Sequence, residues 1–240
     1  MKKVLSSLII GGGLMASGAL SAQEIGIAIT NLTNATYFTP LLITAHDART
    51  HLFEPGTEAT PQLQAMAEGG DLSGLILDVE SQGNDYVANP AGGLLSPGAT
   101  AEAVLDLHGG KTRYLSLVGM LIPTNDGFVG LDSLEIPRAR GVYTYYLPGY
   151  DAGTEANDEI ITGGGAPNTP GIPADPGGHA GVGGIAQVGP DANPTVHIHR
   201  GVIGDDDPLG GPSDLDARVH GWQNPVAKLV ITVGKRSYRD

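Results

Sequence analysis

Short strand-like runs separated by turn-forming residues constrain the fold of this chain more than any other feature. The segment EIGIAIT (24–30) places Ile25, Ile27 and Ile29 at alternating positions. This alternation is typical of a strand with one buried face. Similar runs, divided by Gly, Pro, Asn and Asp, are predicted to form strands at 40–46, 74–80, 101–107, 113–121, 141–147, 195–199 and 227–233. The pattern predicts an all-β fold, an antiparallel β-sandwich or barrel.

Two segments interrupt the strands. One short helix is predicted to begin at Thr60, whose hydroxyl can cap it, with Pro61 in the first turn and Gly69 at its end. The segment 162–194 contains ten glycines and six prolines and almost no large apolar residue. Such a composition cannot bury enough surface to order itself easily, so a long, flexible Gly/Pro-rich loop is expected there.

The N-terminus predicts export. Lys2 and Lys3 precede an apolar stretch too short and glycine-broken to span a membrane well, and small residues allow cleavage after Ala22. Residues 1–22 are therefore predicted to be a secretory signal peptide and 23–240 the secreted protein, extracellular or periplasmic, with no membrane span. The chain contains no cysteine, which excludes disulfides and a lipoprotein anchor.

The acidic balance of the chain restricts its partners. The formal net charge is -13, and loss of Lys2 and Lys3 with the signal peptide makes it more negative. This charge opposes nucleic acid and anionic membrane surfaces as partners and favours the binding of cations.

Carboxylates recur in two turns that follow strand-like runs. Asp126 lies in NDGFVG, and Asp151 and Glu155 lie four residues apart across Gly153 in YDAGTE. Calcium takes six to eight oxygen ligands, commonly several carboxylates, and would offset the repulsion between these side chains. The spacing alone equally allows two separate, solvated acidic turns. A second acidic loop, 204–216, lacks the register of an EF-hand, and a solvated loop is favoured there over a calcium site at Asp205, Asp207, Asp214 or Asp216.

Histidines offer an alternative metal site. His197 and His199 alternate along a predicted strand, so both imidazoles could approach one transition-metal ion, with His220 or His179 completing the set. Ordinary histidines on a partly exposed polar face explain the same pattern and are favoured. His46 and Glu68 could form an acid/base pair, although structural hydrogen bonds account for them equally well. The sequence carries no nucleophile elbow, HExxH motif or P-loop, so no catalysis is expected.

Three ordered segments resemble the spondin domain family, the N-terminal domain of F-spondin and the main domain of mindin. They are YFTPLLITAHDARTHLFEPGTEATPQLQAMAEGG (37–70), LVGMLIPTNDGFVGLDSLEI (117–136) and LPGYDAGTEAND (147–158). The second resembles the family's Met-x-x-Pro-Ser-x-Asp-x-x-Val-Gly signature and the third its Tyr/Trp-Asp-Ala-Gly-Thr-Asp. The resemblance extends from about Ile25 to Asn157.

This resemblance implies a C2-like antiparallel β-sandwich with a calcium ion (Ca2+) held in loops at one end. Its ligands would be Asp126, Asp151 and Glu155, the last of which stands where the family has Asp. The family's cysteines and the thrombospondin repeats of the animal proteins are missing, which indicates a free-standing spondin-like domain. By analogy, the expected role is adhesion-type binding of an extracellular, cell-surface or matrix component, protein or glycan. The alternatives are a His-based transition-metal protein or metalloenzyme and a purely structural envelope or matrix protein.

Overall fold

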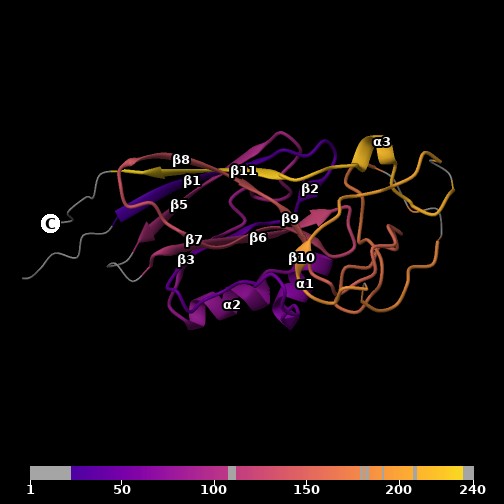
Figure 1. The fold of residues 1–240 in the computed structure, drawn as a ribbon, viewed down its shortest axis with the longest axis horizontal. Helices are drawn as coiled ribbons and strands as arrows, with labels where there is room; N and C mark the ends of the chain where they lie inside the picture. The colour runs from indigo at the N-terminus through magenta and orange to yellow at the C-terminus, as the bar shows by residue number, and fades with distance from the viewer. Residues whose placement is uncertain are drawn as a thin grey trace, which may run out of the picture.

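The computed structural model of the chain describes residues 23–107, 112–178, 181, 184–190, 192–207 and 210–234. The predicted signal peptide and His179 lie outside these residues. The described part is a sandwich of two antiparallel sheets with two helices packed on the outer face of one sheet (Figure 1). An all-β sandwich is therefore confirmed.

The strands and helices have the following bounds. The strands are β1 (Gln23–Asn31), β2 (Tyr37–Phe38), β3 (Leu42–His46), β4 (Asp85–Ala88), β5 (Thr100–Leu107), β6 (Tyr114–Ile122), β7 (Gly127–Glu135), β8 (Gly141–Leu147), β9 (Gly149–Asp151), β10 (His197–Ile198) and β11 (Ala227–Val233). The helices are α1 (Pro61–Gly69), α2 (Ser73–Ser81) and α3 (Ala217–His220).

The first sheet has the strand order β5-β1-β11-β8 and covers one side of the main core. Its strands alternate as predicted: Ile25, Ile27 and Ile29 of β1 are buried, whereas the residues between them are partly exposed. They pack against inward residues of the second sheet, among them Leu117 of β6 and Val129 of β7. This sheet is thus covered on one face only.

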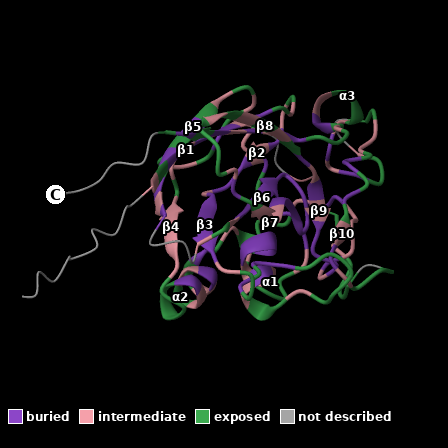
Figure 2. Ribbon diagram, turned by 60° about the vertical axis from the view of Figure 1, so that its left-hand side comes forward, coloured by how far each residue is buried: buried purple, intermediate pink, exposed green. Residues whose placement is uncertain are grey.

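The second sheet has the order β10-β9-β7-β6-β3-β4, with β2 paired to β6, and is covered on both faces. A second core lies between it and the helices, where Val118 and Met120 of β6 meet Leu63 and Met66 of α1. The two-sided burial explains why β6 is buried at every position from Leu115 to Ile122 and is apolar almost without interruption. Figure 2 shows this buried sheet between the exposed outer surfaces of α2 and the first sheet.

The structure corrects the helix prediction. The predicted helix is present, with Leu63 N donating to Thr60 Oγ1 at 3.1 Å, but the segment 74–80 that was predicted as a strand is part of helix α2. Leu75 and Val79, four residues apart, are buried on one helical face, while Leu77 between them is 64% exposed. A strand would have placed all three on the same face. The prediction of a single helix is also wrong, since α3 is a third.

Strand prediction failed where glycine and polar residues break the apolar pattern. The longest strand it missed is β7, which contains Gly127, Gly130 and Asp132. The short strands β2, β4 and β9 were also missed, and the run predicted at 195–199 is a strand only at His197–Ile198. Among the described residues, no helix is long and apolar enough to cross a membrane.

The described residues of the Gly/Pro-rich segment 162–194 form no helix or strand, as predicted, but its two ends differ in packing. Ile172 is fully buried, and its main-chain N–H donates to Ile160 O at 2.8 Å. Asp175 is also buried and lies 3.3 Å from His220 Nε2 of α3. In contrast, Ile185 and Val188 are 93% and 90% exposed. The composition did not reveal that a part of this segment is anchored in a core.

We therefore predict uneven amide hydrogen exchange along this segment. The Ile172 amide should exchange much more slowly than those of residues 184–188, because it is buried and hydrogen-bonded. Exchange followed by mass spectrometry of peptides covering 168–176 and 184–190 tests this. Equal and rapid exchange in both peptides would show that residues 168–176 are not anchored.

Candidate functional site

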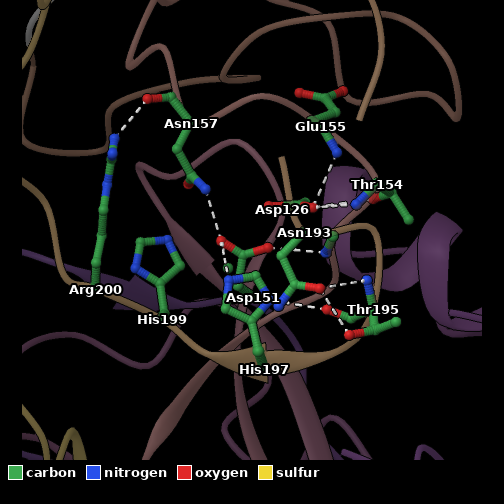
Figure 3. A network of polar contacts seen from close by, with 12 residues as sticks. Asp126, Asp151, Thr154, Glu155, Asn157, Asn193, Thr195, His197, His199 and Arg200 are labelled. Carbon is green, nitrogen blue, oxygen red and sulfur yellow. Dashed lines mark hydrogen bonds and ion pairs between the residues drawn. The ribbon is translucent and has the colours of Figure 1, made fainter. Parts of the chain in front are cut away.

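Strand pairing brings three loops together at one end of the sandwich. In the register of the second sheet, Gly127 of β7 and His197 of β10 both pair with Asp151, the last residue of β9. Asp126 directly precedes β7 and therefore lies beside Asp151. Figure 3 shows the side chains that meet there. The predicted neighbourhood of Asp126 and Asp151 is thus a consequence of the pairing of β7 with β9.

Asp126 is fully buried, and its two carboxylate oxygens differ in their hydrogen bonding. Its Oδ2 accepts hydrogen bonds from Thr154 N at 2.7 Å, Thr154 Oγ1 at 3.1 Å and Glu155 N at 3.0 Å (Figure 3). Its Oδ1 is buried and has no hydrogen-bond partner among the described residues. A buried carboxylate oxygen is costly to leave unsatisfied, so this oxygen is suited to a ligand.

Asp151 is 1% exposed, and its carboxylate is held by the loop that follows it. Gly153 N donates to Oδ1 at 2.8 Å, and Asn157 Nδ2 donates to Oδ2 at 2.6 Å. Gly153 has a φ of 73°, and a Cβ on it would lie 2.8 Å from Asn193 O. Only glycine fits this turn without displacing the neighbouring chain.

Burial and the neighbouring charge disfavour the ionised form of Asp126. Burial, followed by the adjacent charge of Asp151, raises the pKa of Asp126 to about 7, although its hydrogen bonds favour the ionised form. The nearby cation Arg200 directs its guanidinium to Asn157 O, to which it donates at 2.7 Å (Figure 3). A cation bound between the two carboxylates would remove the repulsion.

Glu155 contributes its main chain to this pair but directs its carboxylate elsewhere. Its Oε2 accepts from Gly171 N at 3.1 Å and from Asn125 Nδ2 at 3.4 Å, while Oε1 has no hydrogen-bond partner among the described residues. Burial raises the pKa of Glu155 to about 8. The structure therefore brings together two of the three predicted carboxylates. No group of three His, Asp or Glu side chains arranged to hold a metal is found within the described ranges.

The two histidines of the alternative site differ in their environments. His197 is partly exposed, with Nε2 3.9 Å from Asp151 Oδ2. His199 is only 4% exposed, its ring lies 5.1 Å from that of Trp222, and its Nε2 has no hydrogen-bond partner among the described residues. Burial lowers the pKa of His199 to about 4, so the ring is neutral at neutral pH. The expectation that both histidines lie on a partly exposed face is wrong for His199.

The other candidate residues have structural partners. His46 Nε2 lies 2.7 Å from Ser116 Oγ, whereas Glu68 accepts from Gln64 Nε2 at 2.8 Å and Asn168 N at 3.0 Å. The hydrogen-bonding interpretation of these two residues is thus supported. In the acidic loop, Asp205 accepts from Ser213 N at 3.0 Å, and Asp216 pairs with Arg218 at 2.7 Å.

Two polar residues that support the site were not found by sequence reasoning. Asn125 donates to Asp158 Oδ1 at 3.0 Å and accepts from Glu159 N at 3.2 Å, which joins the turn before β7 to the loop after Glu155. Glu159 is buried, and its carboxylate accepts from Ile203 N, Gly204 N and Ser213 Oγ, each at 2.7 Å. For Glu159, the indication in the sequence was the density of polar residues in EANDE (155–159).

Comparison with known families identifies the chain. The model of the spondin N domain (Spondin_N) matches residues 31–175, which include Asp126, Asp151 and Glu155. The chain belongs to the spondin N family, and it is an extracellular spondin-like domain on that basis. A comparison with curated proteins gives no significant match.

The raised pKa of Asp126 predicts a pH-dependent stability in metal-free protein. Because the carboxyl is easier to protonate when folded than when unfolded, its contribution is fully present below about pH 4 and is lost as the pH rises through about 7. Asp126→Asn keeps an oxygen for the three hydrogen bonds and has no charge. We therefore expect its melting temperature to exceed that of the wild type increasingly from pH 5 to about pH 8. A melting-temperature difference that does not change with pH would contradict the raised pKa.

The unequal burial of the histidines predicts unequal effects of their removal. His199→Ala should lower the free energy of unfolding by about 1–3 kcal/mol, because it leaves a cavity beside Trp222. His197→Ala should change it by less than about 0.5 kcal/mol, since this side chain is partly exposed. Urea denaturation of both variants measures these values. Equal losses would refute the assigned difference in packing.

Proposed function

We propose that this chain is an extracellular domain that binds calcium at Asp126, Asp151 and Glu155. The loops around this site attach to a cell-surface or matrix component, and the domain catalyses no reaction. The observation that carries the proposal is the buried pair of Asp126 and Asp151, in which Asp126 Oδ1 has no hydrogen-bond partner among the described residues. Membership of the spondin N family supports the extracellular setting.

The chemistry of these donors fits a hard divalent cation. Asp126 and Asp151 are both carboxylates, and calcium binds oxygen ligands and prefers several charged ones. Each carboxylate is already oriented by main-chain N–H groups, from Thr154 and Glu155 for Asp126 and from Gly153 for Asp151. Little ordering of the side chains is therefore needed on binding, which favours affinity.

Glu155 is the third ligand in this proposal, and its carboxylate has to turn from Gly171 and Asn125 toward the Asp126–Asp151 pair when the cation binds. Its Oε1 is buried without a hydrogen-bond partner in the described part of the chain, and burial raises its pKa to about 8. Both features indicate that the ionised carboxylate lacks sufficient stabilisation from the protein itself. A cation would supply that stabilisation, since it favours the charged form.

The surroundings of the site suit a binding surface. Ile185, Val188, Ile198 and Ile203 belong to segments next to it and are 93%, 90%, 53% and 60% exposed. Gln187 N donates to Asp158 Oδ2 at 2.6 Å, which connects one of these segments to the loop that follows Glu155. Exposed apolar residues in loops, here Ile185, Val188 and Ile203, are typical of recognition sites. By ordering these loops, calcium would prepare the surface for its partner.

A transition-metal site at the histidines is the second candidate. It is favoured by Nε2 of His199, which has no hydrogen-bond partner in the described part of the chain, and by the position of His197 beside Asp151. Metal analysis of protein purified without added metal separates the two candidates. Calcium supports the first, and zinc or copper in stoichiometric amount supports the second.

The calcium proposal predicts a reversible thermal shift. Calcium at about a hundredfold above its Kd should stabilise the native state by about 2.7 kcal/mol. This corresponds to a rise of about 5–10 °C in melting temperature for a chain of this size. EGTA should reverse the shift, and magnesium should not reproduce it, because magnesium requires a smaller octahedral site. Differential scanning calorimetry measures the shift.

Single substitutions identify the residues that are responsible for the calcium-induced rise in melting temperature. Asp126→Asn and Asp151→Asn should abolish it, Glu155→Gln should weaken it, and Glu155→Asp should retain it. Asp207→Asn removes an exposed carboxylate from the separate acidic loop and should leave the response unchanged. No shift and no calorimetric binding at about millimolar calcium would overturn the proposal.

A further inference from the structure

Strand β8 lies at one edge of the first sheet. Strand β8 pairs along its whole length with β11, from Gly141 opposite Val233 to Leu147 opposite Ala227. Within the described residues it has no hydrogen-bonded strand on its other side. The main-chain N–H and C=O groups of that edge are therefore available to another strand.

Strand β8 lacks the features that protect the other edges. Its sequence, GVYTYYL, has no charged residue and no proline, and its aromatic and β-branched residues favour strand pairing. By comparison, edge strand β5 carries Glu102 and Asp106. The two edges of the second sheet, β10 and β4, have only two and four residues.

The side chains of β8 fall into two faces. Tyr143 and Tyr145 are partly buried and pack against the main core. Val142, Thr144 and Tyr146 point outward, where Val142 is 68% and Tyr146 is 62% exposed. Two large apolar side chains on an open edge indicate a surface that a partner covers.

The sequence of β8 is complementary to itself. If two copies of the strand pair antiparallel about Thr144, Val142 of each lies opposite Tyr146 of the other, and Tyr143 lies opposite Tyr145. Thr144 then lies opposite its own counterpart on the two-fold axis. β-Branched and aromatic residues are favourable cross-strand neighbours, and Thr–Thr pairs can hydrogen-bond.

The distribution of charge also fits a second copy. Arg138 and Arg140 are exposed just before β8 begins, and the acidic loop with Asp206 and Asp207 lies toward the end where β8 finishes. Trp222 establishes that position, because it packs both on Gly149, two residues after the end of β8, and in the cluster that contains Leu215. Antiparallel pairing brings the basic end of one copy toward the acidic end of the other.

We propose that strand β8 forms a homodimer interface, in which two copies pair antiparallel about Thr144 and join their first sheets into one continuous sheet. The interface is a two-fold contact in which each residue meets its counterpart in the same register. It lies on a different sheet from the Asp126–Asp151 site, so it does not depend on the calcium proposal.

Charge substitution at the two-fold axis tests this proposal. Thr144 is exposed, so Thr144→Lys and Thr144→Glu should fold normally and melt close to the wild type. In a dimer each new charge would lie opposite its own copy, and like charges directly opposite are destabilising. Sedimentation velocity over a concentration series should show a monomer–dimer equilibrium for the wild type and monomers for each variant.

Mixing the two variants gives the decisive result. The introduced lysine of one chain would face the introduced glutamate of the other, so an equimolar mixture should regain dimers that contain one chain of each kind. Native mass spectrometry with one variant isotope-labelled identifies them. Thr100→Lys and Thr100→Glu, on the exposed face of the opposite edge strand β5, are the matched controls and should dimerise like the wild type.

Three results would overturn the proposal. They are a wild type that stays monomeric at every concentration, Thr144 variants that dimerise as well as the wild type, and a mixture of folded variants that forms no mixed dimer. The second result would place any self-association at another surface.

Discussion

The architecture depends on a sheet that is covered on both of its faces. Strand β6 contributes Leu117 to the core between the sheets and Val118 and Met120 to the core beneath the helices. Neither core could form alone, since removing one layer would expose the other face of the same apolar strand to water. The strands that pair with β6 on either side lie between the same two cores. Strand β7 lies directly beside β6, and its own pairing with β9 fixes where the carboxylate-bearing loops meet.

The same packing makes the loop end electrostatically unusual. Asp126 directly precedes β7 and Asp151 is the last residue of β9, so the pairing of these two strands places both carboxylates in buried positions. Main-chain N–H groups satisfy part of their hydrogen-bonding capacity, yet the pKa of Asp126 is still raised to about 7. A folded domain that holds two carboxylates in this way favours either protonation or a bound cation. The stability of the sandwich therefore depends on whether Asp126 is protonated or a cation is bound in these loops.

A few buried contacts anchor part of the Gly/Pro-rich segment to the rest of the domain. Its residues have little apolar surface, but Ile172 enters a small core with Val202 and Leu215, and Gly171 N donates to the Glu155 carboxylate. Two segments that are distant in sequence thereby brace each other near the site. Glu159 does the same for Ile203, Gly204 and Ser213, which donate three hydrogen bonds to its carboxylate. Buried carboxylates thus stabilise loops in a chain that contains no cysteine.

The sequence by itself determined the elements whose residues carry a complete local signal. Alternation identified β1, capping identified α1, and the motifs around Asp126 and Asp151 identified the family. It could not determine α2, because Leu75, Leu77 and Val79 are compatible with either a strand or a helix until the neighbouring layer buries two of them and leaves Leu77 exposed. It also could not determine the burial of His199 or the direction of the Glu155 carboxylate. Those features depend on contacts with Trp222 and Gly171, residues that only the tertiary structure brings near. Local patterns record local preferences, whereas burial and side-chain direction are set by neighbours far away in the chain.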